Sequence, residues 1–120
     1  MFKVLVVDDN EGFIKLIPEF FEEFEDFSFV GMSDPAAALD RIKNEPFDVI
    51  ITDLKMPKIS GTELFQQARD NGFDRPIYVL SGHLDQVTSE RLMAKGFAGA
   101  FLKPPERFDI IEELRKDLKA

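Results

Sequence analysis

Charged residues directly follow three short apolar runs in this chain. The runs and the residues after them are 4–7 with Asp8 and Asp9, 49–52 with Asp53, and 99–102 with Lys103. If these runs are parallel strands, the charged side chains all lie at one edge of one sheet, where the carboxyl ends of the strands meet. Carboxylates that close together repel one another unless a cation lies among them or some stay protonated. The spacing therefore predicts a site for a divalent cation and a phosphoryl group.

The residue types at this edge indicate a particular chemistry. Carboxylate oxygens suit Mg²⁺, which keeps several of its waters and prefers phosphate groups as further partners. One carboxylate can act as a nucleophile on phosphorus, as in enzymes that form an aspartyl phosphate. The metal ion and Lys103 would neutralise charge on the transferring oxygens. Ser81 follows the apolar run 77–80, and its hydroxyl would donate to the same oxygens.

Each of these residues also has an ordinary structural explanation when it is taken alone. An acidic residue at a helix start is favourable by roughly 0.3–1 kcal/mol, so capping explains one of Asp8 and Asp9 but not both. Asp53 and Ser81 fit turns, and most lysines, such as Lys103, are solvated. Only the set as a whole favours the phosphoryl site.

Longer amphipathic segments separate the apolar runs and predict the elements that position the site. We expect strands at 4–7, 27–30, 49–52, 77–80 and 98–102, and helices at 10–24, 35–43, 62–70, 85–95 and 107–118. Asp34 and Pro35 form an N-cap followed by a proline at the first helical position. Pro18 should kink the first helix because it lacks a backbone N–H. We assign the phenylalanines of this helix to the core.

This alternation of strands and helices predicts an α/β fold. Strands that are apolar throughout are typical of a parallel sheet covered by helices on both faces. Right-handed crossovers make such a sheet doubly wound. A length of 120 residues fits one domain, and we assign residues 1–120 to a single one.

Composition excludes several classes of function. The chain has no cysteine, so it has no disulfide and no thiolate metal site. The net charge of −8 argues against direct nucleic-acid binding, which needs lysines and arginines on phosphates. No apolar stretch is long enough to cross a bilayer, so we expect no membrane insertion. We expect a cytoplasmic protein.

Together these motifs resemble the receiver domain of two-component response regulators. The resemblance spans the whole chain and rests on motifs in the family's order and spacing: Asp8-Asp9, Asp53, Lys55-Met56-Pro57 with Gly61, Leu80-Ser81-Gly82, and Lys103-Pro104. It implies a CheY-like, flavodoxin-like fold with five parallel strands in the order 2-1-3-4-5.

The resemblance also implies a role for each site residue. Asp53 would accept a phosphoryl group from a phosphohistidine. Asp9, Asp53 and the backbone carbonyl of Lys55 would bind Mg²⁺ directly, and Asp8 would act mostly through water. Ser81 and Lys103 would hold the phosphoryl oxygens.

The partners implied by the resemblance are a sensor histidine kinase or a histidine phosphotransfer protein, and a downstream effector protein. A phosphorylation-dependent homodimer is a further expectation. We expect no conventional enzyme activity, only self-catalysed phosphoryl transfer and autodephosphorylation. The alternatives are a phosphorelay intermediate and a pseudo-receiver that serves as a binding module. A haloacid-dehalogenase-type phosphatase fits less well, because it needs Asp-x-Asp and a cap domain, and this chain has Asp8-Asp9-Asn10.

One position departs from the family's pattern, and two others have side chains that bear on the lifetime of the phosphorylated state. The family usually has an aromatic residue three positions before the lysine, which here is Ala100. Phe101 follows it, but neighbours in a strand point to opposite faces, so Phe101 should not replace that ring unless a bulge shifts the register. Lys55 and His83 occupy the positions that flank the path of the attacking water. We expect them to shield the aspartyl phosphate.

Overall fold

The computed structural model describes residues 1–119, and the side chains of residues 1–118. One parallel sheet has the strand order β2-β1-β3-β4-β5, as predicted. Its strands are β1 (Phe2–Val7), β2 (Phe27–Met32), β3 (Val49–Thr52), β4 (Ile77–Ser81) and β5 (Gly99–Leu102). The helices are α1 (Glu11–Phe20), α2 (Pro35–Asn44), α3 (Gly61–Asp70), α4 (Gln86–Lys95) and α5 (Arg107–Lys119). The predicted doubly wound fold is confirmed.

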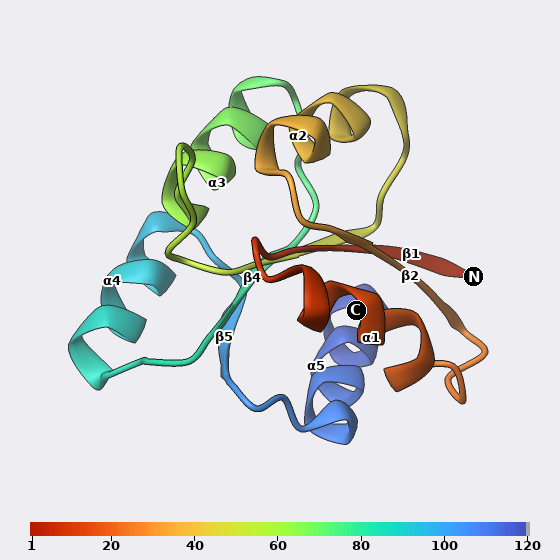
Figure 1. The fold of residues 1–120 in the computed structure, drawn as a ribbon. Coiled ribbons are helices and arrows are strands. Elements are labelled where there is room, and N and C mark those ends of the chain that lie inside the picture. Colours follow the sequence, from red (N-terminus) through yellow and green to blue (C-terminus); the bar gives the residue numbers. More distant parts are fainter. Residues whose placement is uncertain (120) are drawn as a thin grey trace.

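Helices cover both faces of the sheet (Figure 1). Helices α1 and α5 lie on one side, and α2, α3 and α4 pack on the other. Successive β1 residues contribute to the two cores in turn, because strand side chains alternate between faces. Leu5 and Val7 join the core under α2 to α4, whereas Val4 and Val6 join the core under α1 and α5. Within the described residues, no helix has both the length and the apolar character needed to cross a membrane.

Side-chain caps fix where most of the helices begin. Asn10, Asp34, Ser60 and Asp85 each accept a backbone N–H from the first turn of the helix that follows. Such a cap satisfies one of the donors that a helix start leaves without an intrahelical partner. The predicted cap at Asp34 with proline at the first position is confirmed.

The prediction that the first helix runs to residue 24 was wrong. Helix α1 contains Pro18 and ends at Phe20, and turns follow over residues 21–23. Proline removes one helical hydrogen bond shortly before this end. The turns bury Phe21 and Phe24, and the Phe21 ring stacks on Phe29 of β2 with 4.0 Å between ring centroids. The last two phenylalanines of the predicted helix, Phe21 and Phe24, therefore reach the core from the segment after α1 rather than from a longer helix.

A glycine lets the β3–α3 loop fold back over the end of β3. The N–H of Gly61 donates to the carbonyl of Leu54 at 2.8 Å. A Cβ atom at Gly61 would lie 2.2 Å from the backbone oxygen of Asp53. No real contact is that short, so any side chain here would displace the backbone that carries Asp53.

We predict that Gly61→Ala lowers the free energy of unfolding by about 1–3 kcal/mol, the usual cost of overpacking. Gly82→Ala is the matched control, because nothing lies within 4 Å of a Cβ atom there. Its effect should stay within about 0.5 kcal/mol. Urea unfolding of the three proteins measures both values, and equal stabilities for the two variants would contradict this account of the loop.

Candidate functional site

The predicted site residues meet at the carboxyl edge of the sheet. The Asp8 N–H donates to Met32 O at 3.1 Å, and the Asp53 N–H donates to Val7 O at 3.0 Å. The Lys103 N–H donates to the carbonyl of Ser81 at 2.8 Å. Each functional residue thus extends the ladder of hydrogen bonds by one step beyond its strand, and the backbone fixes where its side chain starts.

The ammonium of Lys103 lies among the carboxylates. Its Nζ atom donates to Oδ2 of Asp8 and lies 3.3 Å from Oδ2 of Asp53. Asp8 is almost fully buried, at 2 % exposure, and its other oxygen accepts the N–H of Asn10 at 3.0 Å. Asp53 Oδ1 accepts the N–H of Leu54 at 2.8 Å. The Lys103–Pro104 peptide bond is cis.

The charges and burial at this edge disfavour the ionised form of Asp53 and favour the charged form of Lys103. Burial, and then the charge of Asp8, raise the pKa of Asp53 above its ordinary value, although Lys103 partly offsets both. Burial alone would lower the pKa of Lys103, but the hydrogen bond and charge of Asp8, with the charge of Asp53, raise it overall. The cluster therefore carries more negative charge than one ammonium neutralises, and this favours a further cation.

The carboxylates can supply oxygen ligands to a metal ion. Asp8, Asp9 and Asp53 each offer one carboxylate oxygen, and these oxygens lie within 4.8 Å of one another. Asp9 is exposed and Asp53 partly buried, so an ion would retain access to solvent. An all-oxygen set open to water fits Mg²⁺.

A pocket of about 350 Å³ lies beside Asp53, and Ser81 forms part of its wall. The Ser81 hydroxyl is bonded within its own loop, where it donates to His83 O at 3.3 Å. Lys55, His83 and Thr88 of α4 also line this pocket. A phosphoryl group on Asp53 would therefore lie next to these side chains.

The β5 residues before Lys103 face as predicted. Ala100 pairs with Val79 and packs toward α4, whereas Phe101 pairs with Leu80 and packs on the opposite face. Phe101 stacks on Tyr78, with 5.4 Å between ring centroids. No bulge shifts the β4–β5 pairing, so Phe101 does not take the place of the missing ring.

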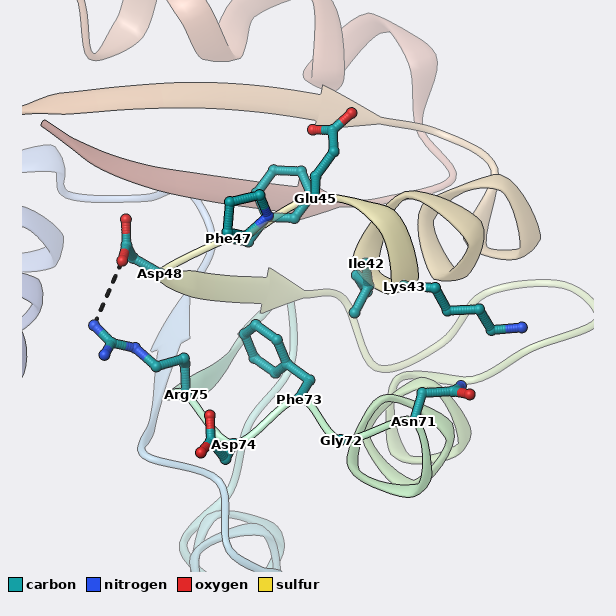
Figure 2. Close-up of a pocket in the computed structure, with 11 residues that line it drawn as sticks. Ile42, Lys43, Glu45, Phe47, Asp48, Asn71, Gly72, Phe73, Asp74 and Arg75 are labelled. Carbon is teal, nitrogen blue, oxygen red and sulfur yellow. Dashed lines mark hydrogen bonds and ion pairs between the residues drawn. The ribbon is translucent and has the colours of Figure 1, made fainter.

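A larger hollow, of about 410 Å³, lies at the other end of the sheet (Figure 2). The loops before β3 and β4 line it, and an ion pair between Asp48 and Arg75 joins these loops at 3.5 Å. Glu45 lies on its rim, and hydrogen bonds from Arg41 and Lys3 lower the pKa of Glu45 to about 2. These charged groups are paired with one another, at the end of the sheet opposite the site.

Sequence reasoning missed three residues that the fold brings to the site. Asn10 donates its N–H to Asp8, and Phe13 of α1 places its ring 4.9 Å from Lys103 Nζ. Thr88 lines the pocket beside Asp53. The sequence offers no local signal for Phe13 or Thr88, because each fits a regular helical pattern and approaches the site only through tertiary packing.

Comparisons with known proteins agree with this geometry. The family model described as the response regulator receiver domain matches residues 4–115. The chain belongs to the response regulator receiver domain family. Receiver domains of this family act in two-component signalling as phosphoryl acceptors, and they generally use Mg²⁺ at their acidic pocket.

Two of the curated relatives are longer than the region that matches this chain. Response regulator MprA of Mycobacterium sp. (strain KMS) is 35% identical over 118 residues, which cover 98% of this chain and 49% of MprA. Autoinducer 2 sensor kinase/phosphatase LuxQ of Vibrio vulnificus (strain YJ016) is 26% identical over 93% of this chain and 13% of LuxQ. The chain thus spans half or less of these relatives.

Solved receiver domains share the fold. The receiver domain of the Francisella response regulator 1452 superposes with a TM-score of 0.89 at 26% identity, over 99% of this chain and 98% of that one. The structure titled FixJ-N superposes with a TM-score of 0.83 at 28% identity, over 99% of this chain and 94% of that one.

We predict that Asp53→Asn stabilises the metal-free receiver domain at neutral pH. Because the pKa of Asp53 is raised in the folded state, charging this group costs stability as the pH rises above its ordinary value of 3.8. Asparagine carries no such charge. Thermal unfolding in a chelator should give a higher Tm for the variant at pH 7, and the difference should shrink toward pH 3. A lower Tm for Asp53→Asn at pH 7 would contradict the raised pKa.

We predict that Mg²⁺ stabilises the wild-type receiver domain through the acidic cluster. At a concentration ten times its Kd, the ion should add about 1.4 kcal/mol to the free energy of unfolding. The gain should fall sharply in Asp9→Asn and Asp53→Asn, which each lose one carboxylate. Denaturant melts with and without Mg²⁺ measure this, and Glu45→Gln, at the far end of the sheet, is the control that should keep the full gain.

Proposed function

We propose that Asp53 accepts a phosphoryl group from the phosphohistidine of a sensor histidine kinase or a histidine phosphotransfer protein. The observation that carries this proposal is the constellation at one sheet edge. A carboxylate of raised pKa lies 3.3 Å from a lysine ammonium and beside two further carboxylates that can hold a cation. Family membership supports the same assignment.

In the proposed step, an oxygen of ionised Asp53 attacks phosphorus. The new P–O bond replaces the P–N bond of the donor, and the donor imidazole leaves with the bonding electron pair. Charge on the transferring oxygens is then stabilised by Lys103 and by the Ser81 hydroxyl. Asp8, Asp9, Asp53 and the carbonyl of Lys55 would hold Mg²⁺, which supplies positive charge to the phosphoryl oxygens when bound.

Two contacts in the unphosphorylated structure must break for this state to form. Lys103 must leave Asp8 to reach a phosphoryl group, and the Ser81 hydroxyl must leave its 3.3 Å bond to His83 O. Both residues belong to segments that lead into α4 and α5. We propose that these rearrangements carry the signal to a downstream effector protein, without the aromatic ring that Ala100 replaces.

A phosphorelay intermediate is the second candidate function. It is favoured by Ala100, because a domain that only passes a phosphoryl group onward needs no aromatic switch. Both candidates involve protein partners and no direct contact with nucleic acid. We propose that either one operates in the cytoplasm and that phosphorylation can promote a homodimer.

We predict that acetyl phosphate with Mg²⁺ phosphorylates the wild-type chain on Asp53. Asp53→Asn should accept nothing, and Lys103→Ala should react at least tenfold more slowly, because it lacks the cation beside the acceptor. Phosphate-affinity gels and intact mass measure the modified fraction. Glu45→Gln is the control and should react like the wild type.

The same experiment separates the alternatives. A wild-type chain that takes up no phosphoryl group under these conditions would identify a pseudo-receiver and refute the acceptor role. Rapid turnover of many equivalents of a small phosphate ester would instead indicate a phosphatase. Transfer from the phosphorylated chain to a histidine phosphotransfer protein would mark a relay intermediate.

We predict that the phosphorylated chain lasts for minutes or longer with Mg²⁺ bound. Lys55 and His83 both line the pocket at Asp53, so they can restrict the approach of water. Removing the donor and following the phosphorylated fraction gives the lifetime. Lys55→Ala and His83→Ala should each shorten it severalfold. Decay of the wild type within seconds would rule out this shielding.

A further inference from the structure

The aromatic ring of Phe13 lies against the functional lysine. Its centroid is 4.9 Å from Lys103 Nζ, within the range over which a cation is attracted by the face of a ring. Phe13 belongs to the first turn of α1, whereas Lys103 follows β5 at the far end of the chain. The contact therefore depends on the tertiary fold.

Two hydrogen bonds in series tie Phe13 to the acidic cluster. The Phe13 N–H donates to Oδ1 of Asn10 at 3.0 Å, and the Asn10 N–H donates to Oδ1 of Asp8 at 3.0 Å. Phe13 also packs, partly buried, against the core beneath α1 and α5. The hydrogen bond fixes the backbone of Phe13, and the core packing helps to place its ring beside the lysine.

The other partners of the ammonium are needed elsewhere during phosphoryl transfer. Asp8 and Asp53, which Lys103 contacts, belong to the carboxylates that can hold a cation. If those oxygens held a metal ion and Asp53 carried a phosphoryl group, the lysine would lose its present ionic contacts. An aromatic face attracts the ammonium but has no net charge, so it competes with neither the metal nor the phosphoryl group.

We propose that Phe13 is a positioning residue that keeps the Lys103 ammonium over the acceptor while its carboxylate partners exchange. This inference rests on the proposed phosphoryl-acceptor function and adds a residue to it. Phe13 acts through Lys103 and does not touch the transferred group. With an aliphatic side chain at position 13, Lys103 keeps its charge, but its ammonium is held less firmly near Asp53.

The test compares Phe13→Leu and Phe13→Tyr with the wild type. Leucine keeps the apolar packing and removes the ring, whereas tyrosine keeps the ring. Phe20→Leu is the matched control, because Phe20 lies on the same helix and its ring faces Arg107, at 6.0 Å, rather than the site. Asp53→Asn shows whether the modification is at the acceptor at all.

The first readout is structural and independent of activity. In NMR spectra, the protons next to Lys103 Nζ should be shifted upfield by the ring in the wild type, in Phe13→Tyr and in Phe20→Leu. They should move toward ordinary lysine values in Phe13→Leu. Unchanged shifts in Phe13→Leu would show that the ring does not face the ammonium in solution.

The second readout is kinetic. At saturating Mg²⁺, Phe13→Leu should slow phosphorylation by acetyl phosphate by about threefold to tenfold, in line with the loss of one cation–π contact. Phe13→Tyr should restore the rate, and the Kd for Mg²⁺, from calorimetry, should stay within about twofold of the wild type throughout. A wild-type rate in Phe13→Leu would overturn the proposal. So would a parallel loss of Mg²⁺ affinity, since it would assign the effect to the Asp8 loop.

These outcomes are distinct from failure of the proposed function. If the wild type takes up no phosphoryl group, the acceptor role fails and the positioning role fails with it. If the wild type is modified on Asp53 and Phe13→Leu behaves identically, only the positioning role fails.

Discussion

The contact of Lys103 with Asp8 and Asp53 is the interaction on which the rest of this site depends. It places one ammonium among carboxylates that the sheet brings within 4.8 Å of one another. The charge is incompletely balanced, since the pKa of Asp53 is raised by burial and by Asp8. In the proposed acceptor, this imbalance would favour binding of a divalent cation, and a metal-bound phosphoryl group on Asp53 would then compete with Asp8 for the lysine.

The backbone at the carboxyl edge of the sheet positions the site residues. Asp8, Asp53 and Lys103 directly follow β1, β3 and β5, and the backbone N–H of each extends a strand ladder by one hydrogen bond. Gly61 allows the next loop to close over the Asp53 carbonyl, and Asn10 links the Asp8 carboxylate to the start of α1. The opposite end of the sheet is held by ion pairs such as Asp48–Arg75.

The sequence predicts the strands and the positions of Asp8, Asp53 and Lys103, because buried parallel strands have a simple apolar pattern and the strand ends are marked by charge. Strand periodicity alone predicts that Ala100 and Phe101 face opposite sides of the sheet, and this is confirmed.

The end of α1 could not be predicted, since Phe21 and Phe24 keep helical spacing although they lie beyond the helix. Phe13 beside Lys103 could not be predicted either, because the contact joins the two ends of the chain and needs the packed α1–β5 geometry. The roles of all the predicted site residues, Lys55, Ser81 and Asp9 among them, stay predictions that rest on position.

In the switch that we propose, Lys103 exchanges Asp8 for the phosphoryl group on Asp53. The most direct measurement is a crystal structure of the chain with Mg²⁺ and beryllofluoride, a mimic of the phosphoryl group. The account predicts the adduct on Asp53, the metal ion on carboxylates of the acidic cluster, and Lys103 Nζ within hydrogen-bond distance of a fluoride and no longer bonded to Asp8. A structure in which the adduct forms on Asp53 while Lys103 stays on Asp8 would contradict it.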